Sequence, residues 1–147
     1  MAIQPITLEN VRIGFRNFSG KATQFNAEGN RNFAVFIDDE TARSLDQIGW
    51  NVKWLKPRDE NDTPQAMISV KVQFGKIPPV VIVIGSNGKT QLSESNINIL
   101  DWAEIQTVDM ILRAYEWEMT GKTGVKAYLK KLYVTVVEDE LEKKYEV

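Results

Sequence analysis

Two long segments near the C-terminal end, 108–119 and 125–137, constrain the fold of this 147-residue chain most strongly. In each segment apolar side chains alternate with polar or aromatic ones, which is the period of a β-strand. The stretch Thr120-Gly-Lys-Thr-Gly124 between them is rich in glycine and suits a hairpin connection. We therefore predict a long antiparallel hairpin as the most regular part of the fold.

The rest of the chain also has a mostly β pattern. Further strands are predicted at 6–18, 32–37, 49–55, 67–74 and 80–84. Ser19 to Asn32 is polar and predicts a long N-terminal loop. One helix is expected from Asp38 to Ile48, ended by Gly49, and a second short one over 93–101. About seven strands without a βαβ rhythm indicate a mainly β fold, an antiparallel barrel or sandwich with one or two short helices.

Two residue types are absent, and their absence narrows the chemistry. The sequence contains no cysteine and no histidine, so it lacks disulfides, thiolate metal sites, the usual general base and most zinc sites. No apolar run has the length of a membrane span, and residues 1–5 do not resemble a signal peptide. We expect a protein that stays in the cytoplasm, with no cofactor, no metal and no membrane association.

Charge is distributed unevenly along the chain. The net charge is −2, but residues 138–147 carry five acids and two lysines, or −3. Residues 10–36 hold four cations and one acid, or +3. We therefore divide the chain into a domain over 1–137 and an acidic tail over 138–147, and locate the positive charge in the domain.

The two faces of the predicted hairpin differ in chemistry. One face is aliphatic, whereas the other alternates rings with cations, a pattern typical of proteins that stack unpaired bases and neutralise phosphates. Cations and one ring of the first strand, together with Arg31 and Lys53, could extend this surface, and Lys56 and Arg58 could continue it. The candidate DNA-binding residues are Arg12, Arg16, Phe18, Arg31, Lys53, Arg113, Tyr115, Trp117, Lys122, Lys126, Tyr128 and Lys130.

A simpler interpretation of the same residues stays open. Trp117 and Tyr128 could pack under a loop while the lysines and arginines are only solvated, as is usual for any one of them. Large aromatic residues most often belong to cores, and we place Trp50 and Trp54 there.

Two enzymatic motifs are suggested and then rejected. Gly-Lys-Thr occurs at 88–90 and 121–123, but a phosphate loop needs a glycine five positions earlier, where the chain has Val83 and Glu116. Acidic clusters at 38–40, at 59–62 and at Asp101 with Glu104 could bind Mg²⁺, as in a nuclease. The first cluster is better explained as a helix start and the second as a solvated loop, so we predict no catalysis.

The segments Arg113-Ala-Tyr-Glu-Trp117 and Thr120-Gly-Lys-Thr-Gly-Val-Lys-Ala-Tyr-Leu129, followed by an acidic end, resemble the single-stranded DNA-binding proteins of bacteriophages. Arg31-Asn-Phe-Ala-Val35 and the segment 49–58 are similar to this group as well. The resemblance implies an OB-fold barrel and a role in replication, recombination or repair in the cytoplasm of an infected bacterium. The tail lacks a terminal aromatic residue, so recruitment of phage or host replication proteins through it is in doubt.

Three hypotheses follow from the sequence. The first is sequence-tolerant binding of single-stranded DNA, with homo-oligomers as an option. The second is a structural phage β-barrel of a tail or of head completion, which has the same β-rich composition. The third is a metal-dependent nuclease.

Overall fold

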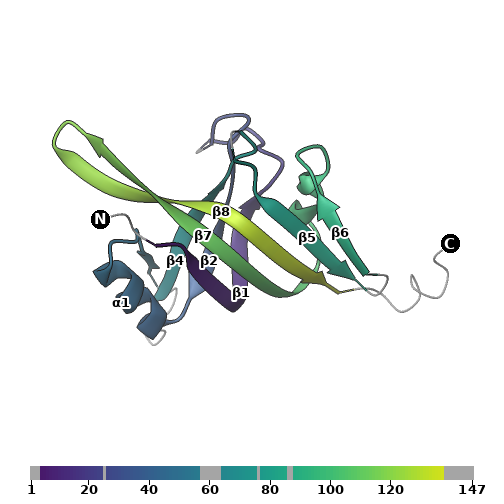
Figure 1. Cartoon of the computed structure of the whole chain (residues 1–147), viewed down its shortest axis with the longest axis horizontal. Helices are drawn as coiled ribbons and strands as arrows, with labels where there is room; N and C mark the ends of the chain where they lie inside the picture. The colour runs from purple at the N-terminus through teal and green to yellow at the C-terminus, as the bar shows by residue number, and fades with distance from the viewer. Residues whose placement is uncertain (1–3, 25, 57–63, 76, 86–87, 138–147) are drawn as a thin grey trace.

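The computed structural model describes residues 4–24, 26–56, 64–75, 77–85 and 88–137. Its strands and helices follow one another in the order drawn in Figure 1. They are β1 (Ile6–Asn17), β2 (Arg31–Ile37), α1 (Asp39–Gln47), β3 (Lys53–Leu55), β4 (Gln65–Val72), β5 (Val80–Gly85), β6 (Gly88–Leu92), the 3₁₀ helix η1 (Ile97–Asp101), β7 (Ile105–Met119) and β8 (Lys122–Val136).

Five of the strands close into a barrel. The order β4-β2-β1-β7-β8 is completed by a parallel pairing of β8 with β4. β1 takes part in two pairings, because its first half pairs with β7 and its second half with β2. A five-stranded barrel of this kind is the OB-fold arrangement. The predicted mainly β, OB-fold-like class is therefore confirmed.

The apolar alternation explains which side chains fill the barrel. Phe33, Val35 and Ile37 of β2 point inward, and Val108, Met110 and Leu112 of β7 meet them in one buried cluster. This is the aliphatic face predicted for the C-terminal hairpin. Trp50 is 1% exposed, as predicted, but the prediction for Trp54 is wrong, because it lies on the edge strand β3 with 43% of its side chain exposed.

Helix α1 begins where the acidic run predicts it. The Asp38 carboxylate caps the helix by accepting a hydrogen bond from the Thr41 backbone N–H at 2.8 Å. Hydrogen bonding to the Thr41 side chain and, second, to the Thr41 backbone N–H lowers the pKa of Asp38 below its ordinary value. Gly49, with φ of 107°, follows the C-cap and ends the helix as expected.

Several boundaries differ from the prediction. The hairpin turn consists of Thr120 and Gly121, both with positive φ, so β8 already begins at Lys122. β6 lies where no strand is predicted, and the second helix is confined to Ile97–Asp101. Among the described residues, no helix has both the length and the apolar character needed to cross a membrane.

Candidate nucleic-acid interface

The hairpin of β7 and β8 extends past the barrel as an arm, visible at the upper left of Figure 1. Its outward side chains are Arg113, Tyr115, Trp117, Lys126 and Tyr128, which we call the arm face. Tyr115 is 53% exposed, and Trp117 and Tyr128 are half-buried. The rings are therefore on the surface and outside the core.

Strand register brings the members of the arm face together. Arg113 lies opposite Tyr128, and Tyr115 opposite Lys126. The Tyr115 and Tyr128 rings meet edge to face with centroids 6.0 Å apart, and the Arg113 guanidinium lies 5.3 Å from the Tyr128 centroid. These contacts hold the Tyr128 ring in place, and the exposed Tyr115 ring remains accessible to a stacking ligand.

Trp117 depends on the glycine across from it. The two residues are register partners, and a Cβ built on Gly124 would lie 2.4 Å from Cζ2 of the indole. The ring can therefore lie flat on the β8 backbone only because position 124 has no side chain. This glycine fixes where the Trp117 ring is presented.

A hollow of about 370 Å³ opens where the arm leaves the barrel. β4 and β8 are paired only at Val70–Ala127 and Lys71–Tyr128, and the chains separate on the arm side of these pairs. The cations and the ring that line the hollow are Lys53, Lys71, Lys126 and Trp117. Lys53 and Lys126 were predicted as site residues, and the structure places both in one hollow with Trp117.

Two further hollows continue this one along β4 and past its C-terminal end. One, of about 740 Å³, contains Arg31 and shares Asn32 and Lys71 with the first. The other, of about 270 Å³, contains Arg113, Tyr115 and Tyr128 and shares Gln73 and Gly75 with the second. We call the three connected hollows the β4 track.

The β4 track is positive although the chain as a whole is negative. Its described lining contains five cations and a single acid, Glu94, for a net +4, whereas the chain has −2. The acid is already engaged, because Glu94 Oε1 accepts from Arg31 Nη1 at 3.3 Å. The track thus combines stacking surfaces with cations, which is what a flexible polyanion with exposed rings requires.

Arg31 differs from the lysines of the track. Its side chain is 20% exposed, and the guanidinium lies 5.7 Å from the Phe74 centroid. Its Nε is buried and has no hydrogen-bond partner in the structure. Arg31 is therefore held partly inside the track wall, with its charge shared with Glu94.

The structure buries one predicted member of the interface, Phe18, and gives a second, Arg16, hydrogen-bond partners within the fold; both lie next to a bulge in β1. Phe18 is fully buried and stacks on Phe33 with ring centroids 5.1 Å apart, so it belongs to the core. Arg16 Nη1 donates to the carbonyls of Leu100 and Ala103 at 2.9 and 2.8 Å. The register shifts between Gly14 and Asn17, so the strict alternation used for the prediction fails from Phe15 onward.

The remaining predicted residues lie around the track without lining it. Lys122 is exposed beside the hairpin turn, and Lys130 is exposed at a bulge of β8. Arg12 is exposed on the outer face of β1. Lys56 is exposed, and Arg58 lies outside the described residues, as does the acidic tail 138–147.

Lys71 is the main residue that the sequence prediction missed. It is exposed, lines two hollows and is the register partner of both Asn32 and Tyr128. The signal was present, because Ser69, Lys71 and Gln73 alternate with the apolar residues of β4. What the pattern alone did not contain was the parallel pairing that brings this face of β4 beside the arm.

The acidic clusters considered for metal binding have structural partners. Asp38 caps α1, and the Asp101 carboxylate accepts from the backbone N–H groups of Phe18 and Ser19. Within the described ranges no three histidine, cysteine, aspartate or glutamate side chains gather closely enough to hold an ion. The acidic cluster at 59–62 lies outside those ranges.

Comparison with known proteins adds the family. Residues 1–147 match the family model described as "Putative phage ssDNA-binding domain". The chain belongs to this phage family. No curated protein sequence matches this family member significantly.

Solved structures of phage single-stranded DNA-binding proteins are similar to this family member. The protein of bacteriophage Enc34 in complex with ssDNA has a TM-score of 0.59 at 14% identity, over 92% of this chain and 88% of that one. A C-terminal truncation of the Enc34 protein has a TM-score of 0.58 at 14% identity, over 92% of this chain and 87% of that one. The bacteriophage T7 protein gp2.5 has a TM-score of 0.43 at 13% identity, over 98% of this chain and 94% of that one. The Enc34 comparisons show that the fold is shared.

Proposed function

We propose that this phage-family domain binds single-stranded DNA with little regard to sequence. The observation that carries the proposal is the arm face beside the β4 track, where the three rings of the arm face and five cations line hollows that share residues. The family assignment and the Enc34 complex with ssDNA support the same ligand. The alternative, a structural barrel of a phage particle, does not by itself account for such a surface.

Stacking and counterion release would provide the affinity. Stacking contributes about 1–3 kcal/mol per base and accepts every base, because each has a π-face. Phosphate contacts from five cations predict a slope of log K against log salt of about −3.5, at −0.7 per contact for single strands. The binding free energy therefore needs no base-edge hydrogen bonds, which is why sequence tolerance is expected.

The biological setting follows from the family. We infer that the protein covers unpaired strands during replication, recombination or repair of phage DNA, in the cytoplasm of the infected bacterium. We assign no catalytic residue. Recruitment of replication proteins through residues 138–147 and self-association stay predictions.

Titration with oligo-dT at two salt concentrations tests the proposal. We expect quenching of tryptophan fluorescence at low salt, with an affinity that falls as salt rises because phosphate contacts are lost. Trp117→Phe should remove most of the quenching while retaining most of the affinity, since the phenyl ring still stacks. Unchanged fluorescence together with no gel shift at low salt would reject single-stranded DNA binding.

A further inference from the structure

Phe15 has a backbone conformation that a bulky residue rarely adopts. Its φ is 48°, in the left-handed region, at the register shift between Gly14 and Asn17. The ring gains no burial in exchange, because 67% of the side chain is exposed. Strain that presents an apolar ring to water indicates a function rather than packing.

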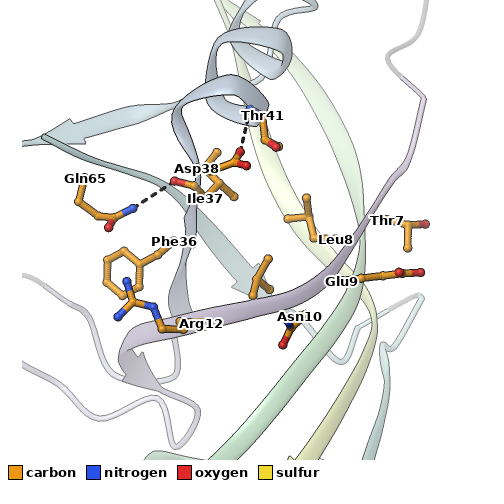
Figure 2. A pocket seen from close by; sticks show the side chains of 11 residues that line it. Thr7, Leu8, Glu9, Asn10, Arg12, Phe36, Ile37, Asp38, Thr41 and Gln65 are labelled. Carbon is orange, nitrogen blue, oxygen red and sulfur yellow. Dashed lines mark hydrogen bonds between the residues drawn. The ribbon is translucent and has the colours of Figure 1, made fainter. Parts of the chain in front are cut away.

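Phe15 does not stand alone on this surface. Its ring centroid lies 6.1 Å from that of Phe36, and the Arg12 guanidinium lies 5.8 Å from the Phe36 centroid. Figure 2 shows the Arg12 side chain beside the Phe36 ring. A Cβ on Gly14 would lie 2.6 Å from the Phe36 ring, so this glycine lets the ring rest on β1. We call Arg12, Phe15 and Phe36 the β1–β2 shelf.

The shelf and the first hollow of the β4 track are on the same side of the sheet. Register pairs Gly14 with Ala34 and Ala34 with Ser69, and Ser69 lines that hollow. Likewise, Phe36 is paired with Met67 and Met67 with Lys53, and Lys53 also lines that hollow. Only two strand spacings separate β1 from β4, a distance of about 10 Å. A flexible strand bound in the track can therefore continue onto the shelf.

We propose that the β1–β2 shelf is a second base-stacking site for the DNA strand held in the β4 track. This inference rests on the proposed function, because it concerns the same ligand. Phe15 and Phe36 receive a base, and Arg12 contacts the adjoining phosphate. Continuity with the track and the cation beside the rings identify the occupant as DNA rather than as an apolar protein segment.

The shelf also borders a hollow of about 510 Å³, drawn in Figure 2. Glu9 and Asp38 line that hollow, and Asp38 is engaged with Thr41 at the start of α1. Arg12 lines the same hollow, and because the two carboxylates repel phosphate, we expect the DNA backbone to stay near the Arg12 guanidinium. The acidic hollow thus limits the direction in which the strand can leave the shelf.

Phe15→Gly is the decisive variant, because glycine adopts a positive φ without steric cost. The variant should be at least as heat-stable as the wild type while lacking the ring. With oligo-dT of about 4 to 16 nucleotides, the range of OB-fold site sizes, both proteins should bind the shortest oligomers equally. The variant should bind the longest about 5- to 150-fold more weakly, the loss expected from one stacked base.

Two further measurements locate the contact. Photocrosslinking of a long oligomer containing 5-iodo-deoxyuridine should modify Phe15 or Phe36 in the wild type. Arg12→Ala should flatten the salt slope by about 0.7, the value of one phosphate contact. Ile48→Ala is the matched control, because Ile48 is also an exposed apolar residue, 57% accessible, but follows α1 and lies off the shelf.

The outcomes separate this inference from the proposed function. Normal wild-type binding with equal affinities for Phe15→Gly at every length would overturn the shelf and leave DNA binding standing. Loss of self-association in Phe15→Gly without loss of affinity would also overturn it, because the ring would then serve a protein contact. A wild type that binds no oligomer would instead remove the proposed function itself.

Discussion

Arg12 and Arg16 occupy the same strand four positions apart and have different environments. Arg12 is exposed beside an aromatic ring, whereas Arg16 is partly buried and donates to two backbone carbonyls. Those carbonyls belong to Leu100 and Ala103, at the end of η1 and just before β7. Arg16 therefore joins β1 to the segment that leads into the hairpin, through hydrogen bonds from Nη1 alone.

Arg16→Ala should destabilise the fold without weakening DNA binding by the folded protein. Removing the guanidinium leaves two partly buried carbonyls without their partner, at a cost of about 1–3 kcal/mol in the free energy of unfolding. Urea denaturation measures that cost, and oligo-dT titration well below the denaturation midpoint measures affinity. A large loss of affinity in a fully folded variant would return Arg16 to the interface.

The residues that were predicted well are those on unbroken strands. Arg113, Tyr115, Trp117, Lys126 and Tyr128 lie on the surface expected from simple alternation. Phe18 is buried although it was predicted on the surface, because the register shift between Gly14 and Asn17 ends the strict alternation of β1. Whether the correctly placed residues touch DNA is what the titrations above decide.

At the level of elements, the arm is the part whose form follows most directly from its sequence. β7 and β8 have fifteen residues each and stay paired from the barrel out to the turn, which consists only of Thr120 and Gly121. β6 was not foreseen, because Gly88–Leu92 has only Leu92 buried and so carries no apolar alternation. An edge strand that is held mainly by backbone pairing with its neighbour need not show an alternation of apolar and polar residues in its sequence.

Gly124→Ala should weaken DNA binding while leaving the melting temperature nearly unchanged. The new methyl group would overlap the Trp117 ring, which can only move away because the opposing β8 backbone is fixed. The site lies on the arm, outside the buried cluster, so the barrel keeps its packing. Thr123→Ala, at the exposed neighbouring position, is the control for affinity and melting. Equal affinities in the two variants would mean that the placement of the indole is unimportant.

At the level of the whole molecule, the barrel and the arm differ in how firmly they are held. Leu112, Leu129 and Leu132 are buried within the barrel, whereas Glu116, Glu118 and Lys126 of the arm are exposed. Regions with few buried apolar contacts open locally at a lower free energy than the core. The arm can therefore adapt to a ligand while the barrel stays closed.

Hydrogen exchange followed by mass spectrometry tests this division. Amides of residues 115–126 should exchange through openings that leave residues 108–112 and 129–134 protected. Adding oligo-dT should slow exchange in 115–126, because the arm face becomes covered and ordered. A single opening free energy for both regions, unaffected by DNA, would contradict the separation of arm and barrel.

The parallel join between β4 and β8 has a consequence for how this protein can change over evolutionary time. Two residue pairs, Val70–Ala127 and Lys71–Tyr128, complete the cylinder, and the second also sits in the middle of the track. A substitution at these positions can impair both the closure of the barrel and the binding of DNA, so selection acts on it for both reasons. We therefore expect substitutions that change DNA affinity without destabilising the fold to accumulate in the distal half of the arm and at the bulge of β1.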